Sequence, residues 1–430
     1  MSKKEATINY LAHPRPFLAW TILILSILFN GYAFALQITT ARLVNSLADS
    51  FHITLPQATY ILGLYLYAFF LMRIPAGILI DRYGTRKIPT LAILLCGGGA
   101  VLLSQSESLV TLGLARVMMG VGGSFAFLNG LKLISNWFYA KRFAYIMGIF
   151  VGLSVLSFMF MEIFILRLEA TIGWREAILA LGLGGFILGC AFFFVVQDAP
   201  GAGFSIHTNQ QEGTLRFFLK KVFHNPQNWI IGIATGFVIG PLLAFEGLWS
   251  RLFLETTYGL SEMSARIINA FFIVGYAIGS PFFGRISSSL EKRKVFIPWG
   301  SGIAILMLLI IIYPPYLGAS LTAVCYFILG FSASTINLGY VTVHEINVPR
   351  VAATGLGIAN TFYAAFSAMS HVLIVVFLQL ALSTSHETAY TPKDFQLSLL
   401  RIPIYLIIGF VFTLFIKETH AKQRYSYEAP

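Results

Sequence analysis

The stretch Gly77-Ile-Leu-Ile-Asp-Arg-Tyr-Gly-Thr-Arg-Lys87 decides how this 430-residue chain is organised. It is a short charged turn between two strongly apolar segments. The charges of Asp81 and Arg86 cannot lie in hydrocarbon, and Gly84 permits a sharp reversal of the backbone. The pattern therefore predicts that one membrane-spanning helix ends here and that the next one begins.

The same pattern recurs 207 residues further along the chain. Gly77 then aligns with Gly284, and Arg86 with Arg293. The offset also pairs Lys87 with Lys294, Ile53-Thr54 with Leu260-Ser261, Ala58 with Ala265, Gly123 with Gly330, Ala126 with Ala333 and Gly148 with Gly355, and it puts Ser288 in the place of Asp81. One fixed offset across several segments predicts a duplicated half-molecule.

Composition excludes an ordinary soluble protein, because 57% of the residues are hydrophobic, only 11% are charged and the mean hydropathy is +0.77. Twelve apolar runs are long enough to cross a hydrocarbon layer of about 30 Å at about 1.5 Å per residue. They are residues 17–43, 57–80, 88–104, 109–136, 143–168, 174–196, 228–254, 264–284, 295–313, 321–345, 351–380 and 397–416. We expect an all-α membrane protein of twelve transmembrane helices in two six-helix halves.

The expected halves are residues 1–196 and 228–430, joined by a cytoplasmic linker at 197–227. Part of the linker, residues 215–223, mixes aromatic and basic side chains at helical spacing. This part either lies flat on the inner leaflet or is a solvated tether.

The net charge of +11 does not indicate a nucleic-acid partner, since the basic residues cluster at alternate loops and chain ends. This positive-inside distribution predicts that both termini are cytoplasmic. The first apolar run is too long for a cleaved signal peptide. Cys96, Cys190 and Cys325 fall inside expected spans and are interpreted as packing residues without a disulfide. No metal-ligand spacing, Walker loop or dinucleotide motif is present in the sequence, so we expect no cofactor, no metal and no enzyme activity.

With these features in place, the whole chain resembles the major facilitator superfamily. The loop motif of that family between its second and third helices matches Gly77, Asp81, Arg82, Gly84, Arg86 and Lys87, and its fourth-helix motif matches Arg116, Gly120 and Gly122. The resemblance implies halves related by a pseudo-two-fold axis and transport by alternating access. It also implies a conformational latch that includes Asp81 and Arg142, with Glu345 in a latch of the second half.

One family pattern is missing, because Gly148–Ser157 lacks the glycine-proline pair of the antiporters. The chain is therefore more similar to uptake systems than to drug exporters. The stretches Asn136-Trp137-Phe138 and Glu246-Gly247-Leu248-Trp249 resemble bacterial nutrient and organic-anion importers, including nutrient transporters of intracellular proteobacteria.

Transport by two rocking halves requires a site near the midplane, and counting residues from the helix ends identifies candidates. The expected substrate-binding residues are Lys132, Asn129, Tyr32, Gln37, Asn337, Tyr340, Asn360, Tyr363 and Trp249. For each amide or tyrosine the alternative is a polar contact that only joins two helices.

Charged groups inside a span carry a stronger functional expectation, since each is costly to bury. Lys132, which has no obvious acidic neighbour at its depth, is the first choice for an anionic substrate group, and snorkelling to the inner interface is the alternative. Glu246 is the first choice for a proton-coupling carboxylate, followed by His371. The alternative for Glu246 is a structural pair with Arg251 or His371. Lys132 and Arg73 are both expected nearer the cytoplasm.

Arg116 and Glu162 lie at equal expected depth in the outer half, so we expect an ion pair between them. The leading functional hypothesis is a monomeric, proton-coupled secondary transporter in the bacterial inner membrane that imports a small polar metabolite such as an amino acid or organic anion. Efflux of a drug or siderophore is the alternative. A membrane-embedded enzyme or a receptor is less favoured, since no catalytic arrangement or large soluble surface stands out.

Overall fold

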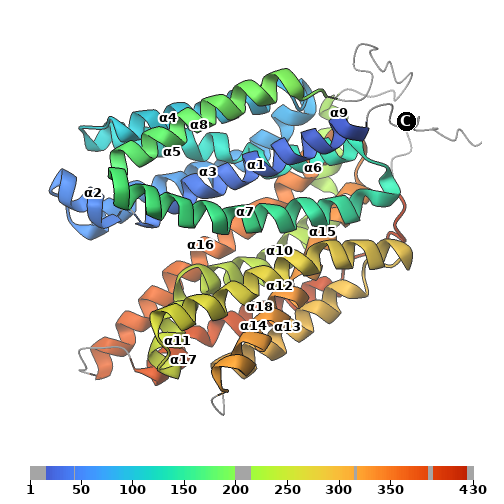
Figure 1. Cartoon of the computed structure of the whole chain (residues 1–430). Helices are drawn as coiled ribbons and strands as arrows, with labels where there is room; N and C mark the ends of the chain where they lie inside the picture. Colours follow the sequence, from blue (N-terminus) through green and yellow to red (C-terminus); the bar gives the residue numbers. More distant parts are fainter. Residues whose placement is uncertain (1–15, 43, 199–214, 314–316, 386–390, 424–430) are drawn as a thin grey trace, which may run out of the picture.

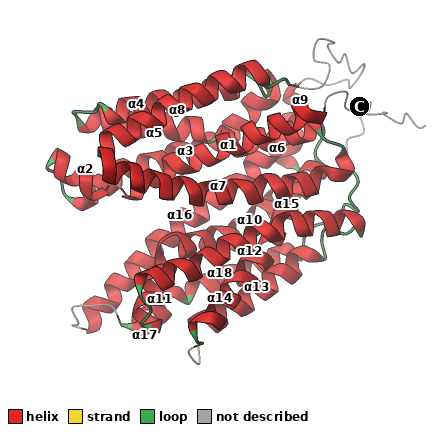
Figure 2. Cartoon of the chain, in the orientation of Figure 1, coloured by secondary structure: helices red, strands yellow, loops and turns green. Residues whose placement is uncertain are grey.

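The fold is entirely helical in the part of the chain that the computed structural model describes, which is residues 16–42, 44–198, 215–313, 317–385 and 391–423. Figure 2 shows helices joined by short loops.

The first half of the chain forms one bundle. Its elements are α1 (Pro16–Arg42), α2 (Val44–Phe51), α3 (Leu55–Tyr83), α4 (Lys87–Ser104), α5 (Leu109–Gly123), α6 (Phe125–Trp137), the 3₁₀ turn η1 (Ala140–Arg142), α7 (Phe143–Ile172) and α8 (Trp174–Val195).

The second half forms another bundle, preceded by α9 (Leu215–His224). It comprises α10 (Pro226–Ala244), the π-helical turn η2 (Phe245–Trp249), α11 (Ser250–Tyr258), α12 (Glu262–Ser289), α13 (Phe296–Ile312), α14 (Ala319–Ala333), η3 (Ser334–Ile336), α15 (Asn337–Ile346), η4 (Pro349–Val351), α16 (Ala352–Ser385), α17 (Pro392–Leu399) and α18 (Arg401–Thr413).

The described part contains 11 helical segments that are long and apolar enough to cross a membrane. The remaining pass is α13, an apolar helix of 17 residues. Seventeen residues lie at the lower limit for spanning the hydrocarbon core. With α13 counted, twelve passes follow one another as the sequence predicted, and the expected fold class is confirmed.

The charged turn within Gly77–Lys87 ends one helix and precedes the next, as the sequence predicted. Helix α3 ends at Tyr83, and Gly84 caps it with a φ of 91°, which favours glycine. The Asp198 carboxylate, which follows α8, accepts hydrogen bonds from the backbone N–H groups of Thr85 and Arg86 ahead of α4. A carboxylate satisfies these otherwise unpaired donors at the start of the helix.

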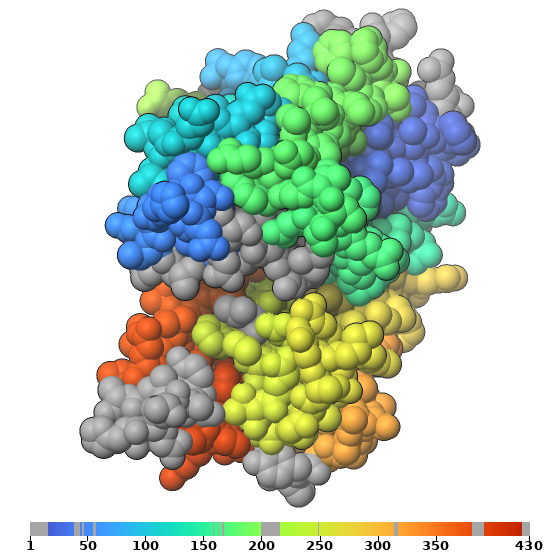
Figure 3. Space-filling model, turned by 60° about the vertical axis from the view of Figure 1, so that its left-hand side comes forward, coloured from blue at the N-terminus to red at the C-terminus, as the bar shows by residue number. Residues whose placement is uncertain are grey.

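The two bundles lie one beside the other, as both the ribbon and the space-filling view show (Figures 1 and 3). Their ribbons approach each other most closely towards the end that carries α9, and they diverge towards the end that carries α2 and α17 (Figure 1). We call the first of these the basic end, because the loop before α4, the turn η1 and α9 bring Arg86, Lys141 and Lys220 there.

Helix α9 falls within the predicted linker, of which residues 199–214 lie outside the described part. Its apolar face packs against the protein, where Phe218 and Val222 are buried beside Val348 and Val351 of the η4 turn. The sequence analysis expected either a helix on the leaflet or a solvated tether. Neither expectation included this contact of α9 with the protein.

Candidate functional site

At the basic end the two halves touch through backbone. A Cβ atom added to Gly77 of α3 would lie 2.5 Å from the carbonyl oxygen of Ala353 in α16. A Cβ atom added to Gly284 of α12 would lie 2.3 Å from the carbonyl oxygen of Ala144 in α7. Both helix pairs therefore approach so closely that only glycine fits, and the two glycines are related by the internal repeat.

The first of these contacts also carries charge. One oxygen of the Asp81 carboxylate accepts from the backbone N–H and the hydroxyl of Thr354, at 2.7 and 2.8 Å, and the other lies 2.6 Å from Lys132 Nζ. The Lys132 ammonium also donates to the carbonyl oxygen of Pro349 in η4. We call Asp81, Lys132, Thr354 and the Pro349 carbonyl the latch. It joins α3 and α6 of the first half to the start of α16, where the helix dipole favours a negative charge.

The latch corrects two expectations. Lys132 does have an acidic neighbour, so the expectation that it lacks one is wrong. The expected partner of Asp81, Arg142, has an exposed side chain in η1, and Lys132 occupies the position expected for it. The physical reason is that Lys132 lies only five residues before the end of α6, so its long side chain reaches the charged turn at the basic end.

The second half contains its own charged cluster at the same end. Glu345 of α15 forms an ion pair of 2.9 Å with Arg293, and both side chains are buried. Arg293 also donates to the hydroxyls of Ser287 and Ser288, and Thr419 donates to Glu345. Every member belongs to the second half, so Glu345 braces that half internally and does not join it to the other.

Three passes depart locally from regular α-helix. The fourth pass has a single turn residue, Ser124, between α5 and α6, and the tenth pass has the 3₁₀ turn η3 between α14 and α15. The seventh pass contains the π-helical turn η2. Short 3₁₀ and π turns inside a helix frequently mark functional positions.

Arg73 of α3 lies beside Ser124 of the fourth pass. Its guanidinium donates to the carbonyl oxygen of Ser124 at 3.1 Å and lies 3.9 Å from the centre of the Phe69 ring. The residue is 3% exposed, no described carboxylate pairs with it, and its Nε has no hydrogen-bond acceptor among the described residues. The phenols of Tyr340 and Tyr363 in the second half are its electrostatic neighbours.

Two buried side-chain amides, those of Asn129 and Asn360, have atoms without a hydrogen-bond partner in the described part. Neither side-chain atom of Asn129 in α6 has a partner in the described part. Asn360 of α16 donates to the Tyr340 hydroxyl at 3.0 Å, while its Oδ1 has no described donor. Tyr340 meets Phe127 of the first half edge-on, at 5.4 Å between ring centres. Buried polar atoms normally have partners, so unpaired ones at the boundary between the halves indicate a place for a ligand.

Other expected substrate residues lie elsewhere. The Tyr32 hydroxyl faces Gly185 of α8 inside the first bundle, where a Cβ atom on that glycine would lie 2.3 Å from it. Asn337 accepts from Tyr276 and donates to Ser280, each at 3.0 Å. The hydrogen bonds of Asn337 match the alternative in which a polar residue joins two helices of one half, whereas the buried Tyr32 hydroxyl has no hydrogen-bond partner in the described part. Gln37 is half-buried on α1, and Trp249 is buried at the end of η2.

Glu246 lies in the π-helical turn and is buried. Its Oε1 and its backbone oxygen both accept from the side-chain amide of Asn269 in α12, at 3.0 Å each. Arg251, the suggested structural partner, instead forms an ion pair of 2.9 Å with Glu262. His371 is half-buried on α16.

Arg116 is satisfied by backbone. Its guanidinium donates to the carbonyl oxygens of Leu36 and Leu62, at 3.0 and 3.3 Å, and lies over the Tyr65 ring. The side chain of Glu162 lies outside the described part, so the expected ion pair stays a prediction.

Comparison with known proteins identifies the family. The profile of the Major Facilitator Superfamily matches residues 11–371. The chain belongs to the major facilitator superfamily. A crystal structure of a bacterial homologue of the human lysosomal transporter Spinster superposes with a TM-score of 0.64 at 16% identity, covering 96% of this chain and 99% of that one, and shares the fold.

Three curated relatives are named as transporters. The uncharacterized transporter YybO of Bacillus subtilis is 26% identical over 52% of this chain and 54% of its own length. The probable sulfoacetate transporter SauU of Cupriavidus necator is 22% identical over 56% and 58%. The probable galactarate/D-glucarate transporter GudP of Pseudomonas putida is 24% identical over 89% and 88%. The matches to the first two relatives thus span little more than half of those proteins, while the family and these relatives are transporters and not enzymes.

Within this superfamily fold, Arg73 is the residue that the sequence analysis did not select for the site. It was expected near the cytoplasm, and that depth stays a prediction. The signal that would have drawn attention to it is a basic residue inside the apolar run 57–80, which contains no acidic residue to pair with it.

Proposed function

We propose that this member of the major facilitator superfamily is a secondary transporter that carries a small organic anion, with Arg73 as the cation that receives it. The observation that carries the proposal is a buried guanidinium without a described carboxylate partner, beside Ser124 of the fourth pass. An isolated cation in a span costs on the order of 3 kcal/mol, and an anionic ligand would offset that cost.

The surroundings of Arg73 suit a small polar solute. Tyr340 and Tyr363 of the second half are electrostatic neighbours of Arg73, and Asn360 donates to Tyr340, so an anion bound at Arg73 would be held by both halves. Asn129, whose side-chain amide has no described partner, is proposed as a further contact from the first half. The names of two relatives point the same way, since galactarate, D-glucarate and sulfoacetate are all anions. Lys132, the first choice from sequence, is neutralised by Asp81 and is assigned to closure of the basic end.

The remaining features of the proposal follow from the charges and the resemblance. The positive-inside distribution makes the basic end cytoplasmic, in a bacterial inner membrane, with both termini on that side. The halves touch at that end, so the site would be approached from outside. Direction is proposed as proton-coupled uptake by a monomer, and efflux of a drug or siderophore is the alternative.

The test is ligand-dependent thermal stability of the purified protein, measured against diacids, monocarboxylates, sulfonates, amino acids and neutral sugars. A ligand at 100 times its Kd stabilises the folded state by about 2.7 kcal/mol. We expect a shift from an anionic class in wild type and in Arg73→Lys, and none in Arg73→Gln. Without ligand, Arg73→Gln should be as stable as wild type, because it removes a costly charge. A purely structural Arg73 gives the opposite result, with lost stability and an unchanged ligand shift.

Glu246 is proposed as the proton-coupling group, because it is a buried carboxylate in an irregular turn of a central pass. Protonation would change the local charge and hence the affinity for an anion. In proteoliposomes, Glu246→Gln should retain substrate exchange and lose uphill, proton-driven uptake. If Glu246→Gln still shows uphill uptake at the wild-type level, Glu246 is not the proton-coupling group and His371 becomes the next candidate.

A further inference from the structure

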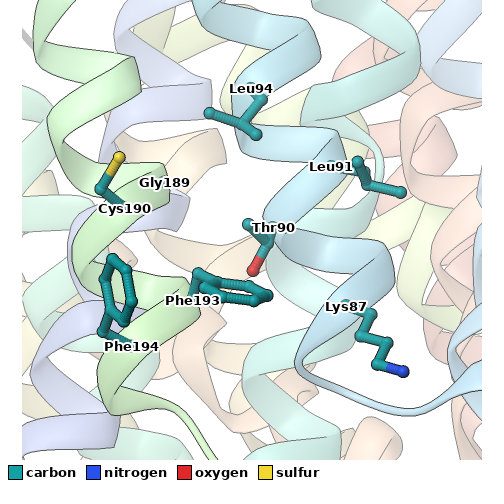
Figure 4. Close-up of a pocket in the computed structure, with 8 residues that line it drawn as sticks. All are labelled: Lys87, Thr90, Leu91, Leu94, Gly189, Cys190, Phe193 and Phe194. Atoms are coloured by element: carbon teal, nitrogen blue, oxygen red, sulfur yellow. The ribbon is translucent and has the colours of Figure 1, made fainter.

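A groove on the outer surface of the first half lies outside the proposed transport site. It has a volume of about 460 Å³ and runs between α4 and α8 (Figure 4). Its lining residues are Lys87, Thr90, Leu91 and Leu94 from α4, and Gly189, Cys190, Phe193 and Phe194 from α8. None of them belongs to the second half.

Helices α4 and α8 pack closely where Gly189 meets Leu94. A Cβ atom on Gly189 would lie 2.7 Å from Leu94 Cδ2, so a larger residue at this position would displace the Leu94 side chain that lines the groove. Its rim consists of exposed apolar side chains, with Leu91 at 61% and Phe194 at 77% exposure. Both helices are membrane spans, so this surface faces acyl chains and not water.

Two cations lie at the basic end of the groove. Lys87 is exposed, begins α4, and carries its ammonium at the lower end of the groove in Figure 4. Arg86 Nε donates to the carbonyl oxygen of Phe193 at 2.8 Å, and its guanidinium lies 4.8 Å from the centre of that ring. The Asp198 carboxylate is engaged by the backbone N–H groups ahead of α4 and forms no ion pair with either cation in the described part.

We propose that this groove binds an anionic glycerophospholipid, with the phosphate at Lys87 and Arg86 and one acyl chain between α4 and α8. The lengths agree, since seven residues from Lys87 to Leu94 span about 10 Å, and one leaflet supplies about 15 Å of hydrocarbon. Juxtamembrane cations attract anionic lipid, and basic pockets between spans bind lipid headgroups. The apolar walls exclude a free anion as the main ligand, because they bind only a molecule with a hydrocarbon chain.

Cys190 provides a direct readout. It is the exposed cysteine of the groove, whereas Cys96 and Cys325 are buried. The experiment measures the rate at which N-ethylmaleimide alkylates Cys190 in detergent-purified protein after addition of phosphatidylglycerol, phosphatidylcholine or soluble glycerol phosphate. We expect phosphatidylglycerol to slow alkylation at least about fivefold relative to phosphatidylcholine, and glycerol phosphate to have no effect.

The matched variants are Lys87→Gln and Lys141→Gln. Both lysines are exposed at the basic end of the first half, but Lys141 lies in η1, outside the groove. Lys87→Gln should remove most of the difference between the two lipids, and Lys141→Gln should keep it. Equal protection by both lipids, equal protection by glycerol phosphate, or an undiminished difference in Lys87→Gln would each overturn the proposal. The labelling requires no transport and is independent of the substrate at Arg73.

Discussion

The two contacts between the halves are copies of one another with different chemistry. At the contact of α3 with α16, Gly77 meets Ala353, and Asp81 adds an ion pair with Lys132 and hydrogen bonds to Thr354. At the contact of α12 with α7, Gly284 meets Ala144, and the residue equivalent to Asp81 is Ser288. The Ser288 hydroxyl donates to the Gly284 carbonyl of its own helix.

This difference distinguishes the features that the fold needs from those that hold the basic end closed. Close backbone approach is needed at both contacts, because the helices of the two halves interdigitate there. Among the described residues, an ion pair accompanies only the contact of α3 with α16. The ion pair of the second half, between Arg293 and Glu345, lies within that half. We infer that the first contact governs the strength of closure and that the second serves as a packing surface.

The largest expected effect comes from Asp81→Asn. Removing one partner of a buried ion pair costs about 3–5 kcal/mol, because Lys132 is left charged and uncompensated. The closed basic end should therefore be strongly disfavoured. The measurement is thiol labelling of Ala144→Cys, introduced at the other contact in a Cys190→Ser background, since Ala144 is buried while the halves are closed.

The internal repeat supplies the control for this experiment. Ser288→Ala alters the equivalent position of the second copy and should leave labelling close to wild type. Adding Lys132→Met to Asp81→Asn should recover part of the loss, because the uncompensated charge is removed. If Asp81→Asn and Ser288→Ala label at the same rate, the asymmetry between the two contacts is refuted.

A smaller effect, equal at both contacts, is expected from filling the glycine positions. Gly77→Leu and Gly284→Leu each force a side chain against a backbone carbonyl, and overpacking of this kind costs about 1–3 kcal/mol. That corresponds to a change of roughly 5–150-fold in the closed-to-open ratio. Gly63→Leu, also on α3 but with no atom within 4 Å of its added Cβ, is the matched control.

The reporter cysteine is placed at the contact that the glycine variant leaves unchanged. It is Ala144→Cys for the Gly77→Leu variant and Ala353→Cys for the Gly284→Leu variant. Unequal effects of the two glycine variants would show that packing, and not only charge, differs between the copies.

The sequence predicted the fold well because its signals are local. Apolar length, charged turns and the glycine at position 84 placed the ends of most passes within a few residues. The local turns at Ser124 and η3 were not predicted, since a continuous apolar run does not show where tertiary packing makes a helix irregular. The expected last span was likewise divided, into α17 and α18.

The site was predicted less completely, because depth along a helix says nothing about which face a side chain occupies. Tyr32 was placed at a suitable depth but faces Gly185 inside its own bundle. Asp81 was predicted in a loop and Lys132 in a helix. Nothing in the sequence indicated that Lys132 Nζ and Asp81 Oδ1 lie 2.6 Å apart in the folded chain. Arg73 was not selected at all, because only the folded chain shows that it is buried and that no described carboxylate pairs with it.

The smallest expected effect concerns a feature that both copies keep. Asp198 accepts from the backbone N–H groups ahead of α4, and Glu418, which follows α18, accepts from the backbone N–H groups of Arg293 and Lys294 ahead of α13. Partial burial acts to raise the pKa of Glu418, but hydrogen bonds from the backbone N–H groups of Arg293, His420, Lys294 and Thr419 prevail and lower it below its usual value of 4.5.

Because the pKa of Glu418 is lower in the folded state than in the unfolded state, its stabilising contribution is present above about pH 4.5 and is lost as the pH falls through the lowered value. Glu418→Gln should therefore lower the free energy of unfolding by about 0.5–2 kcal/mol at pH 7, as loss of a helix cap does, and the difference from wild type should shrink below pH 4.5. Thermal unfolding of both proteins between pH 3.5 and 7 measures this. Asp198→Asn should cost a similar amount at pH 7 if the two caps are equivalent. A loss in Glu418→Gln that stays constant across this range would mean that Glu418 acts through packing, and the correspondence between the two caps would then be one of shape and not of charge.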